Sequence, residues 1–415
     1  MFPVRPSPTL PKRRSSSDMA RAAVRRCAAC APPRVALPSR RSALVAAACV
    51  ALAFVLWTPF CRAWGALIRA LRTNHAEVHV ATMYGFGTLS AAGMLDELWI
   101  IGRLFPASRP LVPMPPWLPL ETQLAAADIV LVSVYGPRAN VEAAMHNHPR
   151  ATWLFVCGEN VALGGGYWDL FVPGADLSMG QRSEDSMRAA TASAGAAFLH
   201  TPWWLPYTLD RHAQGRCPLP AALQRPANAA AWRARPGFAC ILSSHYNYPR
   251  RGLFDALSSI GFVTSPGGAF HNSEWPSDLP TGHLDGKPAF LTRFRFNICP
   301  ENSMSVDGDG GYNTEKLPQA LAAGTVPVYW GDTVEPSVFN PARILRFNGS
   351  VAAITAAVAR LESDAVAADA FFAQPALLPT AQAWVDAWCD RAAARFDWLV
   401  RRVDERRAGV ARIVK

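Results

Sequence analysis

The chain has 415 residues, of which 50% are hydrophobic and 17% are charged, so it can form two ordinary domains with a large buried core. Its net charge of +10 is concentrated at the two ends. Residues 1–41 carry ten Lys and Arg against one Asp, residues 391–415 carry eight against three acidic residues, and the rest carries 23 basic against 27 acidic residues. This distribution argues against a nucleic-acid interface across the globular part.

The first 42 residues are rich in Arg, Ser, Pro and Ala and lack a periodic apolar face, which predicts a disordered cytosolic tail. An uncharged stretch, ALVAAACVALAFVLWTPF, follows at 43–60. Its length and the basic residues before it predict a single-pass signal anchor through the membrane at 43–62, with a stem at 63–75. An organelle transit peptide stays an open alternative, because the tail is rich in Arg and Ser and nearly free of acids.

From residue 76 onward, short apolar runs alternate with stretches compatible with helices, which is typical of parallel sheets in α/β proteins. The expected strands are 76–83, 127–136, 151–160, 237–247, 294–299 and 325–331. The Pro-, Ala- and Arg-rich stretch 217–237 separates them into two groups. We therefore expect an N-terminal domain at 76–220 and a C-terminal domain at 221–380.

The last segment, 381–415, is predicted to be an amphipathic helix. Its apolar residues share roughly one face: Trp384, Trp388, Phe396, Leu399 and Val403. We expect this face to pack against the fold. A membrane-surface helix and a homodimer contact are the alternatives.

Polar residues gather after the run at 294–299 and at the start of the helix that follows. They are Glu301, Asn302, Tyr312, Glu315 and Lys316. Ligands of open parallel sheets bind at the carboxyl ends of strands, and a helix N-terminus with a Lys attracts an anion such as a diphosphate. The residues alone predict a nucleotide or nucleotide-sugar pocket, in which Glu315 can accept hydrogen bonds from ribose. Capping of the helix by Glu315 and Asn302 is the alternative that they leave open.

Other signatures are incomplete. The stretch YGFGTLS at 84–90 lacks the third Gly of a dinucleotide fingerprint, and DGDGGYNTE at 307–315 lacks the spacing of a calcium-binding EF-hand. The His residues show no metal-ligand spacing, so we predict no metal centre. The five Cys residues beyond position 150 permit one or two disulfides and require none.

The stretch FRFNICPENS…GYNTEKLPQALAAGTVPVYWGD, at 294–332, resembles the signature of the α-1,3-fucosyltransferases, glycosyltransferase family 10. The shared pattern is an aromatic-alternating strand, ENS, Y-x-TEK, a short helix and VPV-x-x-G. Weaker likeness at 158–176, 200–207 and 250–257 extends the resemblance over most of 76–375. Four features depart from the family pattern: Pro300 in place of an aromatic residue, Asn313, a longer loop at 304–311, and the glycines Gly164–Gly166 in the expected acceptor loop.

The resemblance implies a GT-B fold, in which two Rossmann-like domains face each other and the C-terminal one binds GDP-fucose. It implies inverting transfer of L-fucose to a glycan hydroxyl, such as the 3-OH of GlcNAc or Glc in an N-glycan or oligosaccharide. No cofactor is required, and a divalent cation (Mn²⁺ or Mg²⁺) is an optional stimulator. The expected location is the Golgi membrane, with the catalytic domain in the lumen.

The resemblance also implies residue roles. Glu159 is the general base, Arg250 and Lys316 hold the diphosphate, and Glu315 binds ribose. The complete donor-binding set is Arg250, Glu301, Asn302, Tyr312, Glu315 and Lys316. The chemistry agrees, because a single displacement from GDP needs one base and preplaced cations but no protein acid.

Two other functions stay open: a related transferase that uses another nucleotide sugar, and a non-catalytic glycan-binding relative. The presence of Glu159, Arg250 and Lys316 argues against the second. The linkage, α-1,3 or α-1,4, is also open. Asn348-Gly-Ser is the one glycosylation sequon and predicts a glycan at Asn348 if the domain is luminal.

Overall fold

The structure is a computed structural model. It describes residues 40–72, 74–84, 90–159, 174–185, 187–188, 196–282, 286–304, 311–332 and 335–409. Contacts between residues divide the chain into two units, 1–59 and 60–415. Two predicted features lie outside the described residues: almost all of the basic tail, and the Gly164–Gly166 loop.

Helix α2 (Arg40–Ala70) covers the whole of the predicted anchor at 43–62 and continues into the predicted stem. Among the residues that the structure describes, no helix combines the length and the apolar character that a membrane span requires. The membrane anchor stays a prediction.

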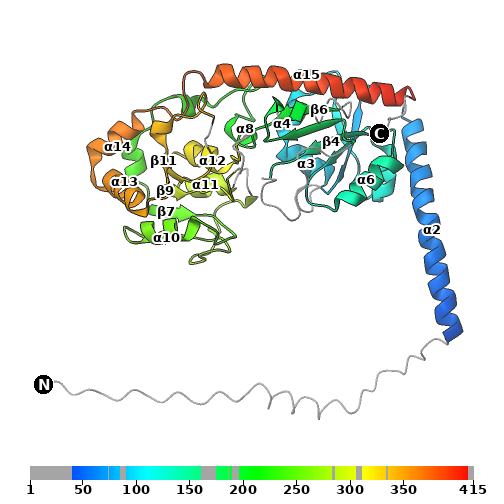
Figure 1. Cartoon of the computed structure of the whole chain (residues 1–415), viewed down its shortest axis with the longest axis horizontal. Coiled ribbons are helices and arrows are strands. Elements are labelled where there is room, and N and C mark those ends of the chain that lie inside the picture. The colour runs from blue at the N-terminus through cyan, green and yellow to red at the C-terminus, as the bar shows by residue number, and fades with distance from the viewer. Residues whose placement is uncertain are drawn as a thin grey trace, which may run out of the picture. The chain divides into compact units, whose positions relative to one another are not determined.

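Residues 60–415 contain two sheets, and every strand pair in both is parallel (Figure 1). The first sheet has the order β2-β1-β3-β4-β5-β6. Its strands are β1 (Val78–Met83), β2 (Leu111–Pro113), β3 (Ile129–Val132), β4 (Thr152–Val156), β5 (Leu177–Gly180) and β6 (Ala197–His200). The helices of this part are α3 (Ala91–Glu97), α4 (Trp99–Leu104), α5 (Leu120–Ala126), α6 (Arg138–Asn147) and α8 (Leu205–Thr208).

The second sheet has the order β11-β10-β9-β7-β8. Its strands are β7 (Gly237–Ile241), β8 (Val263–Thr264), β9 (Phe294–Ile298), β10 (Val326–Tyr329) and β11 (Leu345–Arg346). The helices around it are η2 (Ala221–Gln224), α9 (Ala229–Arg233), α10 (Arg250–Ser258), α11 (Lys287–Leu291), α12 (Lys316–Ala322), η4 (Pro341–Arg343), α13 (Val351–Ser363) and α14 (Ala365–Phe372).

The α/β class with parallel sheets is confirmed, and each of the six expected strands is present. Their continuous apolar runs are explained by burial on both faces. In β3, for example, Ile129 and Leu131 enter one core cluster while Val130 and Val132 enter another. Five strands lie outside that list, namely β2, β5, β6, β8 and β11, and each is only two to four residues long.

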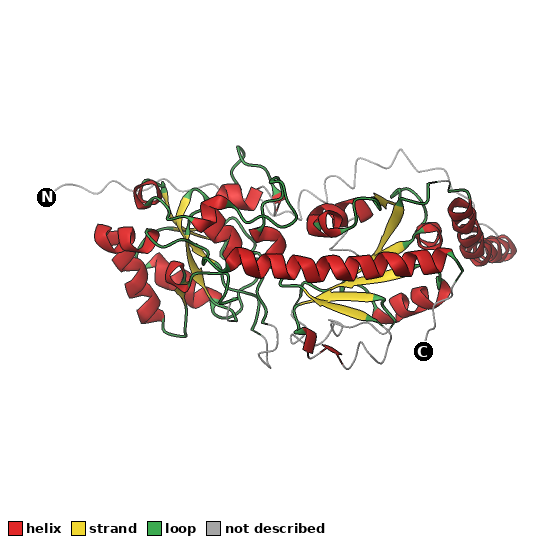
Figure 2. Cartoon of the chain, turned by 90° about the horizontal axis from the view of Figure 1, so that it is seen from above, coloured by secondary structure: helices red, strands yellow, loops and turns green. Residues whose placement is uncertain are grey.

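Helix α15 (Ala381–Arg407) is uninterrupted and runs along both sheets (Figure 2). Four of the five apolar residues predicted to share a face are fully buried: Trp388, Phe396, Leu399 and Val403. They join a core cluster that also contains residues of β1, β4 and α12. A disulfide between Cys217 and Cys389 links α15 to the segment that precedes the second sheet.

This disulfide closes a loop of 172 residues between two segments that pack on the shared core. Replacing both Cys217 and Cys389 by Ala should lower the free energy of unfolding by about 2–5 kcal/mol, because the unfolded chain gains conformational freedom. Urea denaturation without reductant measures this, and the variant Cys61→Ala, at a buried free cysteine, serves as the control. Wild-type stability that is unchanged by reductant would contradict the crosslink.

Candidate active site

The order of strands in the second sheet reverses between β7 and β9, because β8 lies beyond β7 and β10 lies beyond β9. Crevices at such a switch point, at the carboxyl ends of the strands, are where open α/β sheets bind ligands. An open pocket of about 410 Å³ lies there. Its lining includes Ser243 and His245 after β7, Asn302 after β9, and the first residues of three helices: Arg250, Lys287 and Lys316.

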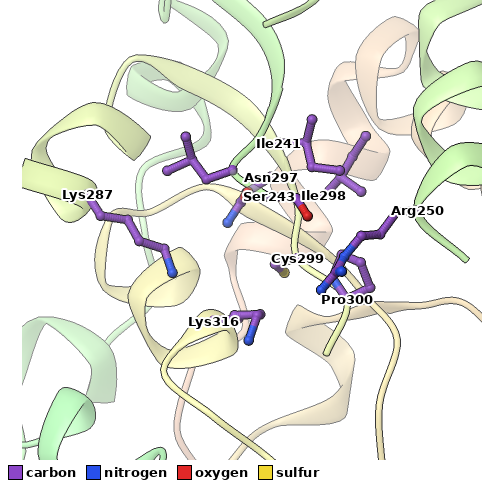
Figure 3. A pocket seen from close by; sticks show the side chains of 10 residues that line it. Ile241, Ser243, Arg250, Lys287, Asn297, Ile298, Cys299, Pro300 and Lys316 are labelled. Atoms are coloured by element: carbon purple, nitrogen blue, oxygen red, sulfur yellow. The ribbon is translucent and has the colours of Figure 1, made fainter. Parts of the chain in front are cut away.

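The side chains of Arg250, Lys287 and Lys316 point toward one common space (Figure 3). Arg250 is buried and donates hydrogen bonds to the side chain of Asn247 and, over 2.7 Å, to Oδ1 of Asn302. Burial lowers the pKa of Arg250. Three cationic groups from α10, α11 and α12 therefore face one pocket, and the sequence analysis had identified two of them.

Glu301 is fully buried, and its carboxylate accepts hydrogen bonds from neighbouring protein groups. The donors are Thr314 N at 2.8 Å, Thr314 Oγ1 at 2.6 Å, Lys316 Nζ at 3.0 Å and Tyr329 OH at 3.3 Å. A Cβ on Gly331 would lie 2.8 Å from the Glu301 Cγ atom, so a glycine is required beside this carboxylate. The structure thus places Glu301 beneath the pocket, where it fixes Lys316; direct contact with a donor stays a prediction.

Glu315 lies next to two of the cations. Its Oε1 atom accepts a hydrogen bond from Lys287 Nζ at 2.8 Å. Burial acts to raise the pKa of Glu315, but Lys287 and Lys316 outweigh it and hold that pKa well below its ordinary value. Burial acts to lower the pKa of Lys316, and Glu301 with Glu315 raises it above its ordinary value. Both groups are therefore ionised at neutral pH.

The capping alternative from the sequence analysis is not what the structure shows. Glu315 occupies the N-cap position of α12 but makes no capping hydrogen bond with its side chain. The side-chain oxygen of Asn302 accepts from Arg250 rather than from the helix. Helix α12 has seven residues, and the amide of Thr314 that precedes it is already bonded to Glu301.

Glu159 follows β4 in the first sheet, and its side chain faces a second, larger cavity of about 560 Å³. Its carboxylate accepts a hydrogen bond from Tyr135 OH at 2.9 Å and another from Tyr312 OH at 3.4 Å. Burial and the adjacent Glu159 carboxylate raise the pKa of Tyr312, so its phenol stays protonated and can donate. A Cβ on Gly158 would lie 2.5 Å from the Trp203 ring, so a glycine is required before Glu159.

Residues 311–315 connect the two sheets at this cavity. The backbone N–H of Asn313 donates to Gln181 Oε1 at 3.0 Å, and Gln181 Nε2 donates to Gly158 O at 2.9 Å. The side-chain oxygen of Asn313 accepts from Tyr329 OH at 2.6 Å. Glu159 and the three cations consequently border one continuous region, since Asn302, Glu315 and Lys316 line both this cavity and the cationic pocket.

The sequence analysis missed Lys287 and Gln181. Lys287 begins a short helix in GKPAFL and belongs to no recognised motif. Gln181 directly follows β5, a strand that was not expected. Asp332, which accepts from the Tyr312 amide at 2.6 Å, ends the recognised motif and was given no role. Of these three residues, only Asp332 lies in a motif from which the sequence could have indicated a role.

Two further predictions concern metals and glycosylation. Among the described residues, no group of three or more His, Cys, Asp or Glu side chains has the arrangement of a metal site. The loop at 305–310, which contains the Asp-Gly repeat, lies outside that part of the chain. Asn348 is exposed, and its side chain accepts from the Ser350 amide at 3.3 Å. Glycosylation there stays a prediction.

Sequence comparison finds a relative with the expected activity. Over 107 residues, or 25% of this chain, the sequence is 37% identical to the α-(1,3)-fucosyltransferase FucT of Helicobacter pylori. The resemblance to the α-1,3-fucosyltransferases is confirmed. The match spans 20% of the length of that relative. No protein-family model matches the chain.

Three crystal structures of α1,3-fucosyltransferase also align with this chain. The structure with GDP has a TM-score of 0.47 and 17% identity, covering 81% of this chain and 97% of the other. The structure with GDP-fucose has a TM-score of 0.47 and 19% identity, covering 80% and 97%. A third has a TM-score of 0.48 and 18% identity, covering 77% and 90%. Because the TM-scores are below 0.5, the functional argument rests on the site and on the sequence match.

Two departures from the fucosyltransferase pattern lie at the site. Pro300 stands where the family has an aromatic residue, and it lines the small space between Arg250 and Lys316 (Figure 3). Asn313 stands inside the Y-x-TEK motif, and its side chain is buried against Tyr329. Pro300 therefore alters the lining of the small space between the cations, whereas the Asn313 side chain is accommodated in the protein interior.

The lowered pKa of Glu315 predicts a dependence of stability on pH. Because this pKa lies below the ordinary value of 4.5, the stabilising contribution is complete above about pH 4.5 and is lost as the pH falls through the folded-state pKa. Glu315→Gln should make the free energy of unfolding depend less steeply on pH in this acidic range. Urea denaturation at several pH values and constant ionic strength measures this dependence. Lys287→Met should also make the free energy of unfolding depend less steeply on pH. Identical slopes for wild type and Glu315→Gln would contradict the assignment.

Proposed function

We propose that this chain is an α-1,3-fucosyltransferase with a GT-B arrangement, which moves L-fucose from GDP-fucose to a hydroxyl group of a glycan. The observation that carries the proposal is the meeting of Glu159, from the first sheet, with the cationic pocket at the switch point of the second. The match to the Helicobacter pylori enzyme supports the choice of fucose among sugars.

The donor diphosphate would occupy the space between Arg250, Lys287 and Lys316. Negative charge develops on the leaving phosphate as the bond to fucose breaks, and cations already in place stabilise that charge without reorganising. Arg250 offers two parallel N–H donors, whereas the two Lys residues supply point charges. Because three protein cations meet the diphosphate, the proposal needs no divalent metal ion, and stimulation by Mn²⁺ or Mg²⁺ is a separate property.

Glu315 would bind the ribose hydroxyls. In the structure one carboxylate oxygen is held by Lys287, which fixes the orientation of the group. A preoriented carboxylate loses little freedom when a sugar hydroxyl bonds to it. Glu301 would contribute indirectly, because it keeps Lys316 ionised and in position.

Glu159 would act as the general base. It would take the proton of the acceptor hydroxyl as that oxygen attacks the fucose carbon from the face opposite GDP, which inverts the configuration. The hydrogen bonds from Tyr135 and Tyr312 orient the carboxylate. The acceptor would lie along Tyr135, Trp203 and Tyr207, since aromatic faces suit sugar rings; the 3-OH of GlcNAc or Glc is the proposed nucleophile.

Replacing Glu159 by Gln tests the role of the base. The amide keeps the size of the side chain but cannot accept the proton, so transfer from GDP-fucose should fall by more than about a hundredfold while GDP affinity is kept. Labelled-fucose transfer and calorimetry with GDP measure the two quantities. Tyr135→Phe, which removes one orienting hydrogen bond, is the milder control. Near-normal turnover by Glu159→Gln would exclude this residue as the base.

Replacing Lys287 tests the third cation. Lys287→Met should weaken GDP binding and lower kcat/KM at least about tenfold, because one phosphate-facing charge is lost and the orientation of Glu315 is no longer held. Lys287→Arg should recover part of the activity. The same assays with UDP- and CMP-sugars test the alternative donor, and hydrolysis of those donors in preference to GDP-fucose would replace the present proposal.

A further inference from the structure

A second basic pocket lies on residues 60–415, at the opposite edge of the first sheet. Its lining residues sit just before the strands: His75 before β1, Asp128 before β3 and Arg150 before β4. The rest of the lining comes from the end of α2 and the residues after it, from Ala125 in α5, and from the last turn of α15, and the volume is about 290 Å³. We call it the amino-edge pocket; the catalytic cavity adjoins the carboxyl ends of the same strands.

The amino-edge pocket has a large excess of positive charge. Five guanidinium groups line it: Arg69, Arg72, Arg150, Arg406 and Arg407. Among the described residues of the lining, Asp128 is the only acidic one. Asp176 lies outside the lining and pairs with Arg406 at 2.9 Å, and the Glu77 carboxylate acts on Arg72 from nearby. Three carboxylates therefore act on five cations that come from three distant parts of the chain.

Contacts with the protein hold these arginines in place. Asp128 is buried and accepts from Arg72 at 3.3 Å, from Arg407 at 2.8 Å and from the His79 amide at 2.9 Å. Arg407 also donates to the carbonyls of His75 and Glu77. Arg69 donates to the carbonyls of Ala127 and Arg150, and Arg406 donates to Asp176. Four of the five guanidinium groups are therefore held by protein contacts, whereas Arg150 is exposed.

The fixed charges repel one another. Burial, together with Arg72, Arg150 and Arg407, lowers the pKa of Arg69 to about 10 against the opposing effect of Asp128. Burial and Arg407 likewise lower the pKa of Arg72. Within the described residues, the buried Nε atoms of Arg69 and Arg406 have no hydrogen-bond partner. An anion in the pocket would relieve the repulsion and could accept from these guanidinium groups.

We propose that the amino-edge pocket binds a small phosphate-bearing anion of about the size of a diphosphate, independently of the donor site. Arg groups prefer phosphate oxygens because their planar N–H pairs match them. The volume of 290 Å³ is far larger than the ~30 Å³ that one water molecule occupies, so it has room for two phosphate groups. Bound there, the anion would bridge α2, α15 and the edge of the first sheet.

The test uses the full chain and inorganic pyrophosphate, titrated calorimetrically with and without saturating GDP. With GDP saturating the donor site, we expect one pyrophosphate to bind, in the millimolar range or tighter; without GDP, a second pyrophosphate is expected at the donor site. Arg150→Glu should weaken that binding at least about tenfold and leave GDP affinity unchanged. Arg225→Glu, the same charge change at an exposed site outside the lining, should change neither. Lys316→Met tests the donor pocket separately, because it should weaken the binding of GDP and leave pyrophosphate binding in the amino-edge pocket unchanged.

Two further arms identify the source of the phosphate. Sulfate at matched ionic strength tests whether phosphate chemistry or charge alone is recognised. Vesicles of neutral lipid with and without phosphatidic acid test a phosphate headgroup; sedimentation with the acidic vesicles that Arg150→Glu abolishes would support the proposal with lipid as the source. Wild-type protein that binds neither pyrophosphate nor acidic vesicles would overturn it, as would pyrophosphate binding that GDP displaces completely or that Arg150→Glu does not change.

Discussion

The hydrogen bonds accepted by the buried carboxylate of Glu301 fix the arrangement of the candidate active site. It follows β9 and holds the backbone and hydroxyl of Thr314, the ammonium of Lys316 and the hydroxyl of Tyr329. A buried pair that loses one partner costs about 3–5 kcal/mol, because the other charge stays desolvated. The entry to α12, and with it the position of Lys316, is therefore fixed by a group that solvent does not reach.

The short segment 311–315 connects the residues around Glu301 with the residues that follow strands of the first sheet. Tyr312 reaches Glu159, and Asn313 reaches Gln181, which in turn holds the carbonyl of Gly158. One stretch of chain thus touches the proposed base on one sheet and the cations on the other. The distance between the two groups is set by hydrogen bonds rather than by a flexible loop, which favours a reaction that needs both at once.

The net charge of the chain does not show where its basic groups gather in the fold. Basic residues near the two ends of the sequence account for the high net charge, yet some of them converge with Arg150 in the amino-edge pocket. The cations of the catalytic region come from another part of the sequence and are balanced by Glu301 and Glu315. The same parallel architecture therefore carries two cationic sites, and the amino-edge pocket has the larger excess of positive charge.

The sequence by itself determined the α/β class, six of the strands and most of the residues that meet at the candidate site. Long apolar runs report burial on both faces of a sheet, and the motif around Glu301 and Lys316 is contiguous. The sequence also indicated a helix over 43–62, and α2 covers that stretch, whereas its insertion in a membrane stays a prediction. Only the tertiary structure decided that Glu301 is buried, that Lys287 joins Lys316, and that Gln181 bridges the sheets. These facts depend on contacts between residues far apart in the chain, and local spacing carries no record of them.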